Sequence, residues 1–411
     1  MSKPVGALEI THLGSREMLD TPHERYDYLR ANAPVSWGTA PLTLPRKGGF
    51  LLTRYDDVNM LFTDERFSTD IIKNTSAGKY TWLLPPSIRM LTQTMVFKDD
   101  PDHKRLRTLV HKAFTPKLVR TMAPDIAKIA EKLADEVAVK REVDLVHDYA
   151  VRLPLAVIAT MLGVADKDRD RFHVMVEKLG TDTGKPSARL RSAATMMKLS
   201  KMFAEMIEDR RINPDEGLIS ELARANEGGD RLTHKETVAM VFLLLLAGHD
   251  TTANLIGNSV LELVQNPDQL ELLRGQPELL ETTALEELLR YTSPVADGAA
   301  RVAMTDLEIA GVPIPKGSQL LGVITSANRD EAHFENPQVL DLTRKPNKHL
   351  SFASGIHYCL GHQLARQEGR IALRALLERF NNWELAVPAE TLRYKPTVTL
   401  RGLTKLPIRM Y

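Results

Sequence analysis

The sequence predicts a mainly α-helical protein with a smaller β region, and two observations carry this prediction. Apolar residues recur at spacings of three and four over long stretches, which is typical of packed helices. Alternating patterns typical of strands are short and few. The expected helices cover residues 116–137, 149–162, 188–210 and 233–265, and the expected strands cover 50–53, 307–310 and 383–387.

Composition indicates one compact protein without a membrane or nucleic-acid role. No break in composition marks a linker, so we expect a single domain over residues 1–411 with no fused reductase. The net charge of +1 gives no reason to expect nucleic acid or an anionic membrane. The polar start resembles neither a signal peptide nor an anchor, and the longest apolar run, 238–247, is shorter than a membrane span. We expect a cytoplasmic monomer.

The single cysteine, Cys359, lies where a glycine-containing loop leads into a predicted helix. One cysteine cannot form an intrachain disulfide or a multi-thiolate zinc site. Free N–H groups and the positive end of the helix dipole favour a thiolate there. A lone cysteine is more often a small buried apolar residue than a metal ligand, so its position alone leaves both interpretations open.

The surrounding residues form the pattern Phe-x-x-Gly-x-His-x-Cys-x-Gly, filled by Phe352, Gly355, His357, Cys359 and Gly361. This pattern resembles the haem-binding loop of the cytochrome P450 family. The resemblance implies the cytochrome P450 fold, with haem b held between the central long helix and the helix after the cysteine loop. It also implies that the Cys359 thiolate is the axial ligand of the haem iron, and that Phe352, Gly355 and Gly361 of the loop bind the cofactor.

The predicted helix at 233–265 is apolar on nearly all sides, yet polar residues interrupt its middle. Thr233 and Glu236 form a capping box that starts it. A buried carboxylate needs a partner or a shifted pKa, and glycine weakens a helix. Such a local cost indicates a functional site, although a kinked core helix with satisfied polar groups would give the same pattern.

The segment from Ala247 to Thr252, Ala-Gly-His-Asp-Thr-Thr, resembles the central-helix motif of the same family. The resemblance implies that Asp250 and Thr251 relay protons to the dioxygen that the haem activates. It also implies that Gly248 opens a groove for dioxygen and that Ala247 and Gly248 bind the cofactor. Cleavage of the O–O bond needs protons delivered into a dry pocket, because bulk water would release peroxide instead.

Glu287 and Arg290 lie three residues apart and can pair on one helix face. Such pairs are common on exposed helices, so the spacing alone indicates little. The resemblance matches them to the Glu-x-x-Arg motif and matches Arg344 to a later arginine, and together these residues brace the cysteine loop. The family usually has an aromatic residue where Leu340 stands, so the packing there is expected to differ.

A charged segment at 100–107 places His103 and Arg107 four residues apart on one face of a predicted helix. A charge run is usually a solvated surface. The resemblance implies instead that His103, Arg107, Arg301 and His357 hold the haem propionates through charge-assisted hydrogen bonds. His349 is a weaker match that would stabilise the loop.

No Gly-x-Gly-x-x-Gly nucleotide fingerprint is visible, so electrons are expected from a separate ferredoxin or flavodoxin with its reductase. By the family geometry, Lys104, Lys112 and Arg366 point outward around the thiolate and form a basic docking face for an acidic partner. Ordinary solubilising charges are the alternative.

The substrate side has no motif, and its candidates are apolar residues chosen by position. Any one of them could be plain core, but as a set they indicate an apolar pocket for a small-molecule substrate, with Asp297 as a polar exception. Fatty acid, terpenoid, steroid and macrolide-type substrates all stay open. The candidates are Trp82, Leu83, Leu84, Met90, Leu91, Val96, Leu243, Leu246, Ala247, Val295, Ala296, Ala299 and Val398.

The sequence therefore predicts a haem-thiolate monooxygenase that uses O2 and external electrons. A haem-thiolate peroxygenase, or an isomerase or dehydratase with the same cofactor, is the main alternative. The Asp250–Thr251 pair argues against it, because peroxide brings its own oxygen and needs no relay. A haem sensor or carrier would not need an apolar pocket together with a proton relay.

Overall fold

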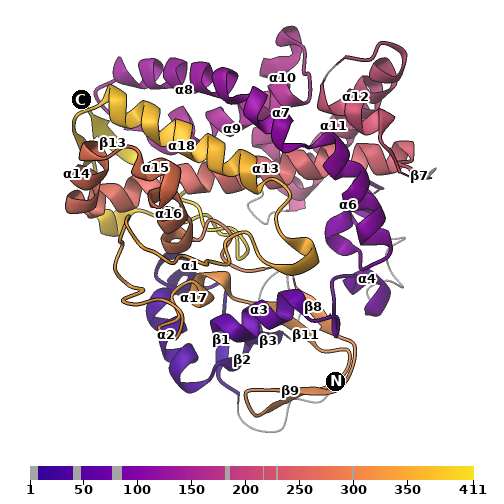
Figure 1. The fold of residues 1–411 in the computed structure, drawn as a ribbon, viewed down its shortest axis with the longest axis vertical. Helices are drawn as coiled ribbons and strands as arrows, with labels where there is room; N and C mark the ends of the chain where they lie inside the picture. Colours follow the sequence, from indigo (N-terminus) through magenta and orange to yellow (C-terminus); the bar gives the residue numbers. More distant parts are fainter. Residues whose placement is uncertain are drawn as a thin grey trace. The chain divides into compact units, whose positions relative to one another are not determined.

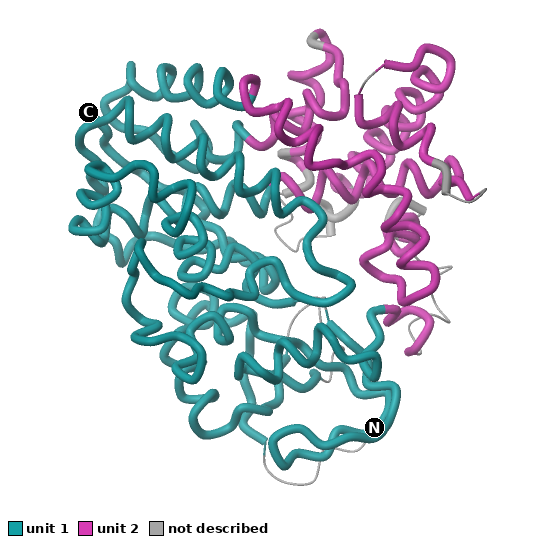
Figure 2. Tube along the Cα trace, in the orientation of Figure 1, with its two compact units in different colours: residues 1–69, 126–153, 250–411 teal, residues 70–125, 154–249 magenta. Residues whose placement is uncertain are grey.

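A computed structural model describes residues 8–39, 48–75, 86–180, 186–215, 217–227, 230–298 and 300–411. The chain forms two compact units, each built from separate stretches, which Figure 2 distinguishes. Unit 1 comprises residues 1–69, 126–153 and 250–411, and unit 2 comprises residues 70–125 and 154–249. The mainly helical fold with a smaller β region is confirmed (Figure 1).

Unit 1 contains a six-stranded sheet in the order β1-β2-β3-β11-β8-β4. Strand β3 pairs parallel with β11, in a register that sets Leu320 opposite Phe50. The sheet packs its apolar face against α3 (Tyr55–Thr63), where Val58 and Leu61 are buried in the same cluster as Phe50 and Leu320. The strands, in that order, are β1 (Ile10–His12), β2 (Val35–Thr39), β3 (Gly49–Leu52), β11 (Gln319–Gly322), β8 (Arg301–Ala303) and β4 (Phe67–Ser68).

Small sheets complete the β region. The pair β9 (Leu307–Ile309) and β10 (Val312–Ile314) is antiparallel, as is the trio β12 (Trp383–Leu385), β13 (Pro407–Met410) and β5 (Val143–Asp144). In unit 2, β6 (Asn226–Glu227) pairs with β7 (Asp230–Arg231). The expected strands at 50–53, 307–310 and 383–387 correspond to β3, β9 and β12, with boundaries that differ by one or two residues.

Helices form the rest of unit 1. The two that position the cysteine loop are α16 (Ala284–Thr292) and α18 (His362–Arg379). The Tyr149 hydroxyl donates to the carbonyl of Ala372 at 2.9 Å and connects α18 to the π-helical segment 146–150. The others are α1 (Arg16–Asp20), α2 (His23–Asn32), α14 (Pro267–Gly275), α15 (Leu279–Thr282), α17 (Ile324–Ala327) and most of α8 (Ala123–Ala138).

Unit 2 is helical apart from its short β pair. An aromatic row packs its interior, because Phe203 lies 6.5 Å from Phe172 and 5.6 Å from Phe242 between ring centroids. The helices are α4 (Ile71–Asn74), α5 (Pro86–Leu91), η2 (Met95–Phe97), α6 (Asp102–Ala113), α7 (Pro116–Thr121), most of α9 (Arg152–Met161), α10 (Asp166–Gly180), α11 (Pro186–Ile212) and α12 (Leu218–Arg224).

The helix expected at 116–137 is divided into α7 and α8, and Pro124 explains why. Proline has no N–H to donate to the carbonyl of Arg120, but it fits the first turn of a new helix. Met122 separates the two helices, and its N–H is shared among carbonyls of the last turn of α7. The helix expected at 149–162 also differs, because a π-helical turn at Val146–Ala150 precedes α9.

The central helix α13 (His234–Gln265) begins as the capping box predicts. The Thr233 N–H donates to Glu236 Oε2 at 2.8 Å, and the Glu236 N–H donates to Thr233 Oγ1 at 3.2 Å. By length and composition alone, this one helix among the described residues is long and apolar enough to cross a membrane. Most of its apolar window is buried inside the protein, as in a core helix.

Candidate active site

The cysteine loop of unit 1 leads directly into α18. Cys359 is half-buried, and its N–H donates to the carbonyl of Phe352 at 3.0 Å. Gly361 is the residue just before the helix begins. This arrangement puts the sulfur-bearing residue in front of the first N–H groups of an 18-residue helix, which favours a thiolate.

Glycine is required at position 355 for two reasons. Its φ of +69° lies in the left-handed region, and a Cβ there would come within 2.5 Å of the carbonyl oxygen of Phe62 on α3. Nearby, the Ser354 hydroxyl donates to Asn59 Oδ1 at 2.8 Å. The loop therefore rests on the end of α3 by close backbone contact.

Glu287 is the centre of a fully buried ionic network behind this loop. Arg290 donates to both of its carboxylate oxygens at 2.7 and 2.8 Å, and Arg344 Nε donates to the same oxygens at 3.1 Å. Arg290 also donates to the carbonyls of Asn328 and Pro337. A buried carboxylate with two guanidinium partners is satisfied, and the network fixes α16 to the segment 328–344.

Leu340, which stands where the family usually has an aromatic residue, is buried with 2% of its surface exposed. Arg344 reaches the carbonyls of Glu335 and Asn336 beside it. The aliphatic side chain therefore fills its place without disturbing the Arg344 contacts.

The remaining candidates for haem binding in unit 1 are Arg301 and His357. Arg301 is buried in β8, and its guanidinium carbon lies 5.6 Å from the centroid of the Phe62 ring. His357 Nε2 lies 3.3 Å from Thr69 Oγ1. Cationic or hydrogen-bonding side chains near a cysteine loop are the donors that the two propionate carboxylates of a haem porphyrin would need.

Asp297 provides a further test of fit. It is 98% buried, and neither carboxylate oxygen has a hydrogen-bond partner among the described residues. Burial raises the pKa of Asp297 to about 8, so the group is largely a neutral hydrogen-bond donor at pH 7. A buried donor without a partner suits a polar group carried by a bound ligand, and the residues present therefore fit haem.

Unit 2 contributes His103 and Arg107 on α6. His103 is buried and its Nδ1 lies 3.3 Å from Asp100 Oδ1, while Arg107 is half-buried. Burial lowers the pKa of His103, so the neutral imidazole is favoured in this unit. Lys104 and Lys112 on the same helix are exposed.

Arg366 departs from the expectation that it points outward. Its Nε and one terminal nitrogen both donate to Glu286 at 2.7 Å, and only 18% of the side chain is exposed. The charge is therefore compensated inside unit 1. The expected docking face loses this member, because a paired, half-buried guanidinium contributes little to long-range steering.

Asp250 and Thr251 are half-buried in α13. The ammonium of Lys395 lies 3.5 Å from Asp250 Oδ1. A Cβ at Gly248 would lie 2.9 Å from Ile158 Cδ1 of α9. Its missing side chain allows close helix packing at that contact.

Lys395 belongs to the C-terminal hairpin, residues 394–403, which sequence reasoning missed. Tyr394 is paired with Leu403, and the Lys395 N–H donates to the carbonyl of Gly402. Two more polar residues of α13 contact this hairpin: Asn258 donates to the carbonyl of Arg401 at 2.8 Å, and Asn254 packs against Gly402. The spacing of 250, 254 and 258 is one helix face, a signal that could have indicated a polar docking partner.

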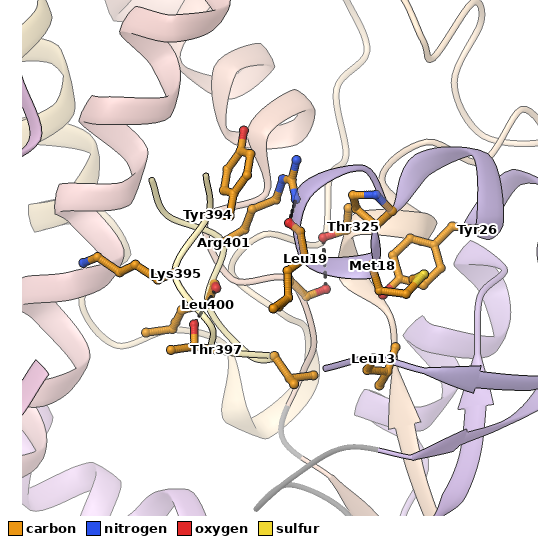
Figure 3. Close-up of a pocket in the computed structure, with 13 residues that line it drawn as sticks. Leu13, Met18, Leu19, Tyr26, Thr325, Tyr394, Lys395, Thr397, Leu400 and Arg401 are labelled. Carbon is orange, nitrogen blue, oxygen red and sulfur yellow. Dashed lines mark hydrogen bonds between the residues drawn. The ribbon is translucent and has the colours of Figure 1, made fainter. Parts of the chain in front are cut away.

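The described substrate candidates share one property: none is fully buried. In unit 1, Ala296 and Val398 line a cavity of about 20 Å³ between the hairpin, α1 and α2 (Figure 3). This cavity has room for about one water molecule. The half-buried or exposed candidates are Met90, Leu91, Val96, Leu243, Leu246, Ala247, Val295, Ala296 and Val398; Trp82, Leu83, Leu84 and Ala299 lie outside the described residues.

Comparisons with known proteins show the family of the chain. The family model described as Cytochrome P450 matches residues 63–276 and 278–402. The chain is 42% identical over 363 residues to the "Polyketide biosynthesis cytochrome P450 PksS" of Bacillus subtilis, covering 88% of this chain and 89% of that protein. The solved PksS structure covers 97% of this chain and 99% of its own, with a TM-score of 0.89 and 39% identity. The structure of P450BioI with an acyl carrier protein ligated to hexadec-9Z-enoic acid covers 96% and 99%, with a TM-score of 0.86 and 38% identity.

Proposed function

The chain belongs to the cytochrome P450 family and is a haem-thiolate monooxygenase, and we propose that it inserts one oxygen atom of O2 into a C–H or C=C bond of an apolar, mid-sized substrate. The observation that carries this proposal is Cys359 at the entrance to α18, behind which Glu287 is clamped by two arginines. The cofactor we propose is haem b, with Cys359 as axial ligand and His103, Arg107, Arg301 and His357 as partners of its propionates.

When bound, the haem supplies the chemistry that activates dioxygen. Asp250 and Thr251 supply the protons. Asp250 is partly exposed and can exchange protons with solvent, whereas the Thr251 hydroxyl delivers them inward. Adjacent residues on a helix do not face each other. The proton therefore passes from one to the other when the Asp250 side chain turns or through an intervening water.

A long aliphatic acyl or polyketide chain is the substrate class we propose. Two relatives support it: PksS is named for polyketide biosynthesis, and P450BioI was solved with a C16 acyl carrier protein. The apolar substrate candidates predicted from the sequence suit such a chain. Electrons would come from a ferredoxin or flavodoxin with its reductase, in the cytoplasm.

The reduced, carbon monoxide-bound absorption spectrum tests the ligand. Wild type should show the red-shifted Soret band of a thiolate-ligated haem, and Cys359→His or Cys359→Ala should lack it, because no other cysteine can replace the ligand. A variant that keeps the band would refute the assignment.

The spin-state shift on adding ligand tests the substrate class. A C16 fatty acid and its acyl carrier protein thioester should each shift the ferric Soret band, whereas a steroid of similar mass should bind more weakly. Tighter binding of the steroid would overturn the acyl proposal and leave the monooxygenase intact.

A further inference from the structure

Glu286 precedes the Glu287 brace but makes a separate set of contacts. Arg366 on α18 donates to both of its carboxylate oxygens at 2.7 Å. His349 Nε2 lies 3.2 Å from Glu286 Oε2, and His349 Nδ1 accepts the N–H of Ser351. Because Nδ1 is an acceptor, the imidazole proton is on Nε2 and points at Glu286. One carboxylate therefore joins α16, the start of the cysteine loop and α18.

The guanidinium that Glu286 holds lies directly against the ligand loop. The central carbon of Arg366 is 4.4 Å from the centroid of the Phe352 ring. Phe352 is also the residue whose carbonyl accepts the Cys359 N–H at 3.0 Å. Arg366 thus packs on the side chain of the residue whose backbone carbonyl accepts the Cys359 N–H. A cation–π contact stabilises this packing.

The pair is charged and poorly hydrated, so it is an electrostatic element as well as a clamp. About a fifth of each side chain is exposed, 18% for Arg366 and 22% for Glu286. Burial alone would raise the pKa of Glu286, but hydrogen bonds from Arg366 and His349 outweigh it and lower that pKa to about 2. Both groups stay ionised across the physiological range.

We propose that Glu286 and Arg366 are a pair of positioning residues for Cys359: they hold Phe352 in place and balance the charge beside the cysteine loop. This inference rests on the proposed role of Cys359 as the haem ligand. It gives Arg366 an internal function in place of a docking function. Bidentate geometry makes the pair rigid, which a lysine at 366 would not reproduce.

Opposite shifts of the haem reduction potential test the charge balance. Glu286→Gln removes the negative charge and leaves the cation beside the loop, so the midpoint potential should become more positive. Arg366→Gln removes the cation and should make it more negative. The double variant should return toward the wild-type value. Shifts of the same sign in both single variants would overturn the proposal.

Amide hydrogen exchange of the haem-loaded protein tests the positioning. Glu286→Gln should speed exchange of the Cys359 amide at least several-fold. The control is Glu281→Gln, because Glu281 also pairs with α18, through Arg370 at 3.4 Å and Arg374 at 3.2 Å, but is half exposed. Equal exchange in the two variants would refute a specific role for Glu286.

The wild-type spectrum separates this inference from the proposal on which it rests. A wild type without a thiolate Soret band would refute Cys359 as ligand. A normal thiolate band combined with unchanged potentials in Glu286→Gln and Arg366→Gln would refute the positioning pair alone.

Discussion

The ammonium of Lys395 lies 3.5 Å from the carboxylate of Asp250 and connects the C-terminal hairpin to the central helix. Both side chains are about 30% exposed, at 28% and 31%. Figure 3 shows Lys395 extending away from the other residues that line the hairpin cavity. The acid of the proposed relay therefore has a partner that holds it toward the hairpin.

If Lys395 acts through Asp250 alone, the two substitutions should not add. Asp250→Asn should slow the whole catalytic cycle, and Lys395→Met should change turnover in the wild-type background. In the Asp250→Asn background Lys395→Met should have no further effect, as a double-mutant cycle on turnover would show. Lys395→Met should lower the free energy of unfolding by less than about 1 kcal/mol, because the Lys395–Asp250 pair is partly solvated. Arg393→Met is the matched control, since Arg393 lies two residues before Lys395 but pairs with Asp20.

Thr251→Ala or Thr251→Val should uncouple reductant consumption from product formation. Without the hydroxyl, proton delivery loses its direction, so hydrogen peroxide should accumulate and product per reductant should fall several-fold. Haem binding should persist, because Thr251 belongs neither to the cysteine loop nor to the proposed propionate partners. Reductant, oxygen, peroxide and product are measured together on one substrate. Full coupling in Thr251→Ala would favour the peroxygenase or isomerase alternative.

Arg290→Ala should impair folding or haem incorporation and not merely slow turnover. Arg290 and Glu287 have no exposed surface, and loss of the cation leaves a buried carboxylate with one guanidinium fewer, at a cost of about 3–5 kcal/mol. Haem content and urea unfolding measure the effect. Arg374→Ala, which breaks an exposed pair with Glu281, should cost under about 1 kcal/mol. A stable Arg290→Ala holoprotein with only slower turnover would contradict this expectation.

Charge reversal at Lys104 or Lys112 should slow reduction by an acidic ferredoxin or flavodoxin. Both lysines are exposed on α6, so their charges act through solvent and the effect should shrink as ionic strength rises. Stopped-flow reduction at several salt concentrations measures this, with substrate affinity as the internal control. Unchanged rates at low salt would remove α6 from the docking surface.

Glu368 on α18 should make stability fall with rising pH. It is 98% buried, and Oε2 has no hydrogen-bond partner in the described part of the chain. Burial raises the pKa of Glu368 from 4.5 to about 8. The folded state therefore holds a proton that the unfolded state has lost between those values, and the contribution of this group falls by about 1.4 kcal/mol per pH unit across that window.

Glu368→Gln should flatten that pH dependence, because the amide cannot ionise. Thermal unfolding from pH 5 to 9 compares it with wild type and with Glu378→Gln, an exposed glutamate on the same helix. The control should keep the wild-type slope. A Glu368→Gln curve parallel to wild type would show that this carboxyl is not protonated in the folded protein.

Interactions between residues close together in the sequence could be predicted from the sequence. The Thr233–Glu236 capping box and the Glu287–Arg290 spacing involve neighbours on one helix, so their geometry follows from the sequence. Contacts over long separations had no such local signal, and the Arg344–Glu287 pair was expected only through the family resemblance. Lys395, which pairs with Asp250, is 145 residues away from it. Arg366 lies in a charged stretch typical of a surface, but it is half-buried because it pairs with Glu286, 80 residues earlier. Pro124 did carry a signal for the break between α7 and α8, and helical periodicity concealed it.

Gly402 limits which positions of the C-terminal hairpin can be substituted. A Cβ at that position would clash with Asn254 Oδ1, and Arg401 beside it donates to the carbonyls of Leu19 and Asp20. The base of the hairpin thus contacts both the central helix and α1, and substitutions at 401 or 402 should destabilise it. The turn around Thr397 and Val398 carries no such lock, so diversity introduced there should alter selectivity while leaving the scaffold intact.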